Sequence, residues 1–425
     1  MTQEKKHSET GQDCPEGYKS CDGYKIPKEW HIVRFDSLFS RVTRKNDENN
    51  QNVLTISAQQ GLISQIEYYN TLYASENKTG YTLLHRGDFS YNKSYSSGYA
   101  YGAIKRLDAY EKGIVSPLYL CFTPRQGVNS DFYLQYFEAG CFDREIYKIA
   151  QEGARNHGLL NVSTEDFFHS MLVFPPLEEQ ERITEILTQC DHVIELKEQK
   201  LDELKQLKKE FLRKMFPAKG CDTPEIRFPG FTGAWEQRKL GELGTITTGS
   251  TPSTSIPDYY SDDGIVWVTP TDICENITFE SARKLSDLGQ QVGRIVPKNT
   301  ILVTCIASIG KNTMLGNTGS FNQQINGLTP NENECDPYFL LTESALWSAK
   351  MKGSAASGTM QIVNRTEFSE LKTWLPSLIE QQAISDFFRQ LDNLITLHQR
   401  ELEETKTYKK TLAKLLLTGI VRVQG

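Results

Sequence analysis

Two stretches of the chain combine cations with hydroxyl and amide side chains and carry almost no acids, which is the chemistry that a polyanionic ligand requires. In residues 81–106, the segment YNKSYSSGYAYGAIKR interleaves tyrosines with lysine and arginine, and Asp88 is the only acid. Lysine and arginine bind phosphates, while tyrosine and serine hydroxyls hydrogen-bond to phosphates or base edges. An exposed edge strand with alternating tyrosine and lysine would have the same composition. The candidate contacts in this stretch are Lys93, Ser94, Tyr95, Tyr99 and Arg106.

The second stretch, residues 293–328, contains no aspartate or glutamate, although 54 of the 425 residues in the chain are acidic. Asparagine and glutamine can pair with adenine through two hydrogen bonds, whereas lysine mainly holds phosphate. A polar turn in which residues 322–324 bond to their own backbone would explain the amides equally well. The candidates in this stretch are Lys311, Asn322, Gln323 and Gln324, and a weaker candidate is the loop that carries Arg155, Asn156 and His157 between two glycines.

The sequence contains none of the motifs that mark a reaction centre. A phosphate-binding loop and a dinucleotide fingerprint are absent, the seven histidines form no metal-binding pattern, and the nine cysteines are scattered without a C-x-x-C pair. We therefore expect a non-catalytic binding protein with reduced thiols and without a metal or cofactor. The polar N-terminus and the lack of a long apolar run predict a cytoplasmic protein with no membrane contact. The net charge of −7 argues mildly against nucleic acid as a ligand, but the acid-poor stretches outweigh it.

A long helix, predicted over Leu177–Phe216, organises the chain around these stretches. It contains neither Gly nor Pro, and its acids precede its bases, which complements the helix dipole. Apolar residues recur every seven positions and predict a seam for one partner helix. Residues 378–417 align with this helix without a gap at an offset of 201 and repeat the seam. The two helices are therefore predicted to form a coiled coil, either parallel or antiparallel. Its polar breaks are Lys197 and Lys208 in the first helix and His398, Thr405 and Lys409 in the second.

Both helices begin with the same short motif, a proline followed four residues later by Glu-Gln. The repeat favours two copies of one partner that dock near these positions, while a role in starting each helix explains it equally well. The four residues are Glu179, Gln180, Glu380 and Gln381.

Two strand-rich domains of mixed α/β type are predicted beside the helices. Short β-like runs separated by Gly, Asn and Ser clusters mark the first domain, and WEQRKLGEL at the start of the second repeats the spacing of WHIVRFDSL at the start of the first. The result is an internal twofold repeat. The predicted parts are a polar N-terminal tail (1–29), the first domain (30–174), the central long helix (175–216), a linker (217–234), the second domain (235–375) and the C-terminal long helix (376–420).

Several of these segments resemble the specificity subunit of type I restriction–modification systems. The resemblance rests on PPLEEQERI and PSLIEQQAI at the helix starts, on TTGSTPST, GIVWVTPTDI, IVPKNTILVTCIASIGKN and FNQQINGL in that order, and more loosely on RGDFSYNKS. It implies two target-recognition domains that each read one half of a split site in double-stranded DNA, separated by an antiparallel coiled coil. It also implies methylation subunits that supply the S-adenosylmethionine chemistry and restriction subunits that supply ATP-driven translocation and cleavage. The partner expected in two copies at the repeated helix starts is then the methylation subunit, so two methylation subunits are expected. The competing interpretation is a non-enzymatic coiled-coil adaptor whose two domains bind proteins.

Overall fold

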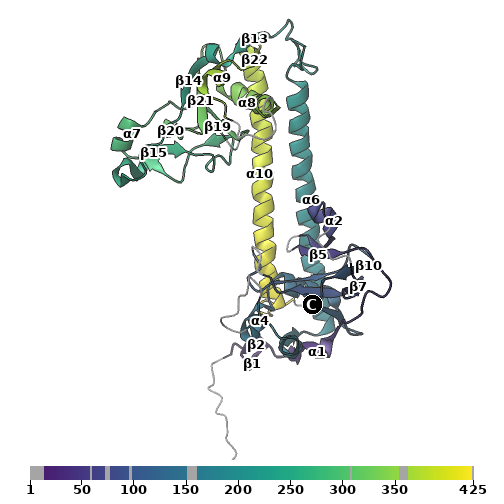
Figure 1. Ribbon diagram of the computed structural model, residues 1–425. Coiled ribbons are helices and arrows are strands. Elements are labelled where there is room, and N and C mark those ends of the chain that lie inside the picture. The colour runs from purple at the N-terminus through teal and green to yellow at the C-terminus, as the bar shows by residue number, and fades with distance from the viewer. Residues whose placement is uncertain are drawn as a thin grey trace, which may run out of the picture. The chain divides into compact units, whose positions relative to one another are not determined.

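The computed structural model describes residues 14–57, 60–71, 77–94, 98–150, 160–306, 309–353 and 362–423. The chain divides into two compact units, one formed by Met1–Lys197 with Glu401–Gly425 and the other by Glu198–Arg400. Two long helices dominate it, α6 (Leu177–Lys214) and α10 (Leu378–Leu417) (Figure 1). Each unit therefore contains one domain, part of α6 and part of α10.

The two helices run antiparallel within the first unit. Asp191 of α6 pairs with Lys409 of α10, and Lys197 pairs with Glu401 at 2.9 Å. Residue numbers rise along one helix as they fall along the other, so the chain directions are opposite. The direction that the family resemblance implied is confirmed.

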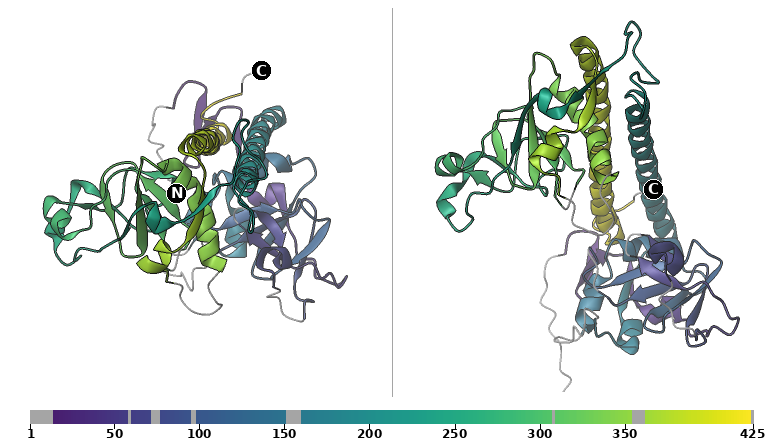
Figure 2. Two further views of the ribbon diagram at one scale, coloured as in Figure 1. Left: turned by 90° about the horizontal axis from the view of Figure 1, so that it is seen from above. Right: turned by 45° about the horizontal axis from the view of Figure 1, so that its top comes forward.

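The second unit repeats this arrangement with equivalent residues. Lys208 pairs with Asp392 at 2.5 Å, and the rings of Phe211 and Phe387 pack edge to face with centroids 4.8 Å apart. Asp392 also accepts a hydrogen bond from Tyr338 of α8 (Pro337–Gly353), which lies beside α10 and crosses it in Figures 1 and 2. Lys208 interrupts the apolar seam because its ammonium reaches an aspartate on the partner helix.

The first domain is built on a four-stranded antiparallel sheet in the order β4-β11-β8-β9, with β5–β6 and β7–β10 as separate antiparallel pairs. Interlocking phenylalanines, including Phe35, Phe89 and Phe122, fill its core. The elements are β3 (His31–Arg34), α1 (Phe35–Leu38), β4 (Phe39–Arg41), β5 (Leu54–Ser57), β6 (Gly61–Ser64), α2 (Gln65–Tyr69), β7 (Thr82–His85), β8 (Phe89–Asn92), β9 (Ala103–Arg106), β10 (Lys112–Val115), β11 (Leu120–Pro124), α3 (Ser130–Glu138), α4 (Asp143–Ile149), α5 (Thr164–His169) and β12 (Met171–Phe174).

The segment predicted as a polar tail differs from expectation in its described part. It contains a hairpin of β1 (Tyr18–Cys21) and β2 (Tyr24–Pro27), in which Ile26 is buried. The Tyr18 hydroxyl donates to the carbonyl oxygen of Gly419 at 2.8 Å. The hairpin is too short and polar to be recognised in the sequence, because contacts with residues about 400 positions away help to hold it in place.

The second domain contains a five-stranded sheet in the order β14-β21-β18-β19-β16, in which only the β16–β19 pair is parallel, and a three-stranded sheet in the order β17-β15-β20. The mixed α/β prediction is confirmed for both domains. The elements are β13 (Glu236–Lys239), η1 (Leu240–Glu242), β14 (Gly244–Thr248), η2 (Pro257–Tyr259), β15 (Tyr260–Val268), β16 (Ile277–Thr278), β17 (Lys284–Leu285), α7 (Asp287–Val292), β18 (Ile301–Thr304), β19 (Asn312–Leu315), β20 (Gly319–Phe321), β21 (Ile325–Pro330), α8, α9 (Arg365–Ser369) and β22 (Lys372–Leu375).

The two units share the way in which each domain leads into its helix. In the first, the strand that follows Trp30 (β3) pairs antiparallel with the strand that precedes α6 (β12). In the second, the strand that follows Trp235 (β13) pairs with the strand that precedes α10 (β22) in the same manner. Both tryptophans are buried. The internal repeat predicted from the two tryptophan motifs is therefore present in the fold.

Candidate nucleic-acid interface

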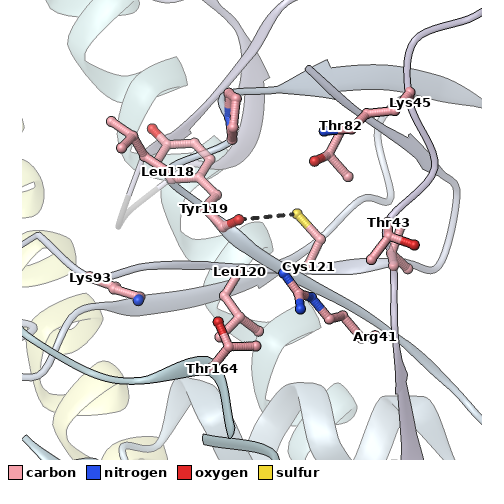
Figure 3. A pocket seen from close by; sticks show the side chains of 12 residues that line it. Arg41, Thr43, Lys45, Thr82, Lys93, Leu118, Tyr119, Leu120, Cys121 and Thr164 are labelled. Carbon is pink, nitrogen blue, oxygen red and sulfur yellow. Dashed lines mark hydrogen bonds between the residues drawn. The ribbon is translucent and has the colours of Figure 1, made fainter. Parts of the chain in front are cut away.

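A cavity of about 310 Å³ in the first unit brings three cations together without a carboxylate in its lining (Figure 3). It lies among the end of β4, the segment after it, the start of β7, the end of β8, the start of β11 and the start of α5. The lining consists of Arg41, Val42, Thr43, Lys45, Thr82, Lys93, Pro117, Leu118, Tyr119, Leu120, Cys121 and Thr164.

Strand pairing explains why these residues meet. β11 is an inner strand with β4 on one side and β8 on the other, so Arg41 at the end of β4 and Lys93 just after β8 flank the same strand. Side chains alternate between the two faces of a strand, so Arg41 is exposed while Val42 is buried in the core. In Figure 3, Arg41 and Lys93 reach from opposite sides toward the space beside Leu120.

The cations of the cavity keep their charge available. Within the described part of the chain, none of the three has a carboxylate at ion-pair distance; Lys45 donates to the carbonyl oxygen of Gly80 at 3.2 Å, and Lys93 to that of Val162 at 2.6 Å. Burial opposes the charge of Lys93, whose pKa it lowers. Burial also raises the pKa of the Cys121 thiol to about 11, so that the cavity floor stays uncharged at neutral pH. Such a site attracts anions, and threonine hydroxyls on its wall can donate to phosphate oxygens.

Of the residues predicted in the first domain, the structure places only Lys93 in this cavity. The Arg106 guanidinium is neutralised by Asp108 at 2.7 Å and Asp131 at 2.6 Å, and the Tyr99 hydroxyl donates to Glu138 at 3.2 Å. The Ser94 backbone N–H donates to the side chain of Asn92 at 3.0 Å. Tyr95, Arg155, Asn156 and His157 lie outside the described residues.

The residues predicted in the second domain lie on two loops that meet at the end of β18. The Thr304 N–H donates to the carbonyl oxygen of Lys311, and the Cys305 N–H donates to that of Gln324. Asn322 is buried, and its side chain bonds both to the backbone N–H and to the side chain of Gln324, as the turn interpretation expected. Lys311 and Gln323 are exposed, although Lys311 donates to the Pro270 carbonyl oxygen and Gln323 accepts from the Thr251 hydroxyl. DNA contact by these four residues stays a prediction.

The repeated glutamates at the helix starts are buried and paired inside the chain. Glu179 accepts from Trp30 Nε1 at 2.7 Å and from the Arg422 guanidinium at 2.6 Å. Glu380 accepts from the Arg227 guanidinium at 2.6 Å. In each unit, an arginine that follows the end of one long helix therefore binds the first turn of the other.

The glutamines beside them close the first turn of their own helices. Gln180 Nε2 donates to the carbonyl oxygen of Pro175 at 2.8 Å, and Gln381 Nε2 donates to that of Pro376 at 2.9 Å. Both side chains are buried. These contacts support the interpretation that the motif starts each helix, and docking of a partner near it stays a prediction.

The sequence interpretation missed Arg41 and Lys45, although a local signal was present. Residues 41–45 read RVTRK, with three cations in five positions. Arg44, the third, is neutralised by Asp88 in the structure. The segment was overlooked because its cations are joined to Lys93 by strand pairing and not by proximity in the sequence.

The chain matches known proteins over most of its length. The family model for the type I restriction modification DNA specificity domain matches twice, over residues 27–206 and 233–407. The MjaVIII type I restriction enzyme specificity subunit of Methanocaldococcus jannaschii is 22% identical, over 96% of this chain and 97% of the relative.

Solved structures share the fold. A chain from a study of complex assembly and conformational transition in the type I R-M system superposes with a TM-score of 0.59 at 17% identity, covering 94% of this chain and 100% of that chain. The type I restriction–modification S subunit from M. genitalium superposes with a TM-score of 0.52 at 14% identity, covering 91% and 96%. No helix within the described ranges is long and apolar enough to cross a membrane. With two copies of the family's domain in the sequence, each ending in one of the two long helices, the chain belongs to the type I restriction–modification DNA specificity family.

Proposed function

We propose that this chain is the sequence-specific DNA-binding subunit of a type I restriction–modification complex, in which each domain reads one half of a bipartite target. The observation that carries the proposal is the cavity of the first unit, where Arg41, Lys45 and Lys93 converge without an acid. Cations that are not neutralised within the protein increase its affinity for a phosphate backbone, through electrostatic attraction and counterion release.

The residues divide between holding the duplex and reading it. The three cations hold backbone phosphates of the first half-site, with the hydroxyls of Thr43 and Thr164 as further donors. In the second domain, the exposed Lys311 holds phosphate and Gln323 reads a base edge.

The chemistry of the complex comes from other chains. Two methylation subunits, one for each repeat of domain and long helix, bind S-adenosylmethionine and methylate adenine. Restriction subunits drive translocation and cleavage. This chain contributes the choice of target and no catalytic group. Its partners are accordingly double-stranded DNA, two methylation subunits and, in the full complex, restriction subunits.

Exchange of one domain tests the modular part of the proposal. Residues 235–375 are replaced by the corresponding domain of a family relative, and methylated adenines are mapped in cells that produce the chimera with its methylation subunits. One half of the methylated motif should change while the other half stays as it was. A change in both halves would refute independent reading.

Binding across salt concentrations tests the role of the cavity. Arg41→Ala should weaken binding to target and unrelated duplexes alike and reduce the slope of log affinity against log salt by about one, because one phosphate contact is lost. Arg34→Ala removes the same charge from the same unit, but Arg34 pairs with Asp36 and does not line the cavity. The Arg34 variant should keep the wild-type slope. Equal slopes for both variants and the wild type would exclude the cavity as a phosphate site.

A further inference from the structure

An apolar side chain stands exposed at the rim of the cation-lined cavity. Leu118 is 71% exposed, whereas Leu120 and Cys121 behind it are buried. A leucine in water gains nothing from hydrophobic burial, and among the large hydrophobic side chains of the described residues only Ile379 is as exposed as Leu118.

The sequence Ser-Pro-Leu-Tyr holds Leu118 in this position. Tyr119 N–H donates to the carbonyl oxygen of Ser116 at 3.0 Å, which closes a turn with proline at its second position, and Leu118 N–H lies 3.3 Å from the Ser116 hydroxyl. The turn connects β10 to the inner strand β11, and Val115 at the end of β10 is fully buried. The backbone on both sides of Leu118 is thus anchored in the core, and the side chain cannot withdraw into it.

The surroundings of Leu118 define what can cover it. Arg41, Lys45 and Lys93 line the same cavity. A ligand that covers Leu118 must therefore place an anionic group near these cations and an apolar group against the rim. Duplex DNA meets both conditions, because phosphates flank the grooves and the C5-methyl group of thymine projects into the major groove.

We propose that Leu118 is a specificity-determining residue of the first domain, which recognises a thymine in its half-site by covering the C5-methyl group. The inference rests on the proposed function and adds a base-reading contact to it. Phosphate contacts position a protein on DNA without reading sequence, so the cations alone cannot distinguish thymine from the other bases.

Deoxyuridine, which lacks only the C5-methyl group, tests the contact directly. The complex of the full chain with its methylation subunits is titrated with the duplex target and with duplexes in which each thymine in turn is replaced by deoxyuridine. The wild type should bind one substituted duplex roughly three- to ten-fold more weakly, as expected for the loss of one buried methyl group. Leu118→Ala should bind the unsubstituted duplex more weakly by a similar factor and should no longer distinguish thymine from deoxyuridine at that position.

A matched control separates this contact from general effects. Leu288 on α7 of the second unit is 52% exposed and does not line the cavity, so Leu288→Ala should retain the wild-type discrimination. The inference is overturned if the wild type binds all substituted duplexes equally, or if Leu118→Ala still discriminates at the position where the wild type does. Failure of the wild-type complex to prefer its target over unrelated duplex would instead refute the proposed function. Equal melting temperatures for the two variants would show that both are folded.

Discussion

Replacement of Glu343 by glutamine should stabilise the second unit in a pH-dependent way. Glu343 of α8 is 2% exposed; its Oε1 accepts from the Trp374 N–H at 3.1 Å, and its Oε2 has no hydrogen-bond partner among the described residues. Burial raises the pKa of Glu343 from 4.5 to about 7. Lys350 and the hydrogen bonds to the carboxyl lower this pKa less than burial raises it, so the carboxyl is more stable neutral than charged.

The folded chain holds the proton of Glu343 to a higher pH than the unfolded chain does. Between pH 4.5 and about 7 the unfolded chain releases this proton while the folded chain keeps it, so the free energy of unfolding falls as the pH rises through this window. At 1.36 kcal/mol per pKa unit, the difference between 4.5 and about 7 amounts to about 3 kcal/mol above pH 7. Glutamine cannot ionise. Glu343→Gln should therefore match the wild type near pH 4 and exceed its unfolding free energy by about 3 kcal/mol at pH 8.

Urea denaturation followed by tryptophan fluorescence measures this difference. Four of the five tryptophans, Trp235, Trp267, Trp347 and Trp374, lie in the second unit, so the signal reports mainly on it. A gap between variant and wild type that is the same at pH 5 and pH 8 would refute the ionisation argument.

Glu145 of α4 in the first unit is a matched control with the opposite expectation. It is also buried, but although burial raises its pKa, hydrogen bonds from Lys148, Tyr24 and the Met171 N–H lower the pKa more. Its ionised form therefore stabilises the fold above pH 4.5, and that stability is lost as the pH falls through the folded pKa. Glu145→Gln should destabilise the protein at pH 8 and have a smaller effect at acid pH.

Two contacts made by the long helices give further predictions. Lys208→Met should lower the unfolding free energy by about 1–3 kcal/mol because it leaves the carboxylate of Asp392 without its cation in a largely buried position, and adding Asp392→Asn should recover part of the loss in a double-mutant cycle. Arg422→Ala should increase hydrogen exchange in the first turn of α6, since it removes the cation that binds the buried Glu179, and unchanged exchange there would show that the contact adds no stability.

The long helices could be predicted closely from their periodicity, whereas their relative direction followed only from the family resemblance. Periodicity gave Leu177–Phe216 for the first helix, and the structure has α6 as Leu177–Lys214. A heptad seam is satisfied by parallel and antiparallel partners alike. Lys208 and Lys409 interrupt the apolar seam, and only the structure shows the reason: each forms an ion pair with an aspartate of the other helix.

The candidate site was predicted in chemical type but only partly in its residues. Composition identified an acid-poor stretch, yet it could not tell which cations the fold would neutralise. Arg106 looked available, but it pairs with Asp108, which lies just beyond the acid-poor stretch, and with Asp131, 25 residues away in the sequence. Arg41 was overlooked and joins Lys93 because β4 and β8 both flank β11. Ion pairing and strand order are properties of the tertiary structure, and both are invisible to local composition.

The ion pairs between α6 and α10 explain how one chain can keep its architecture while its binding surfaces diverge. The ion pairs Asp191–Lys409 and Lys208–Asp392 are the same contact, related by the offset of 201 that aligns the two helices. Neither contact involves a residue of the cation-lined cavity. Substitutions at the cavity rim, such as those proposed for Leu118, therefore leave these ion pairs intact, because residues without shared partners contribute independently to stability. Selection for new target sequences can act on the domains at little cost in stability, provided that the lysine–aspartate pairs are retained.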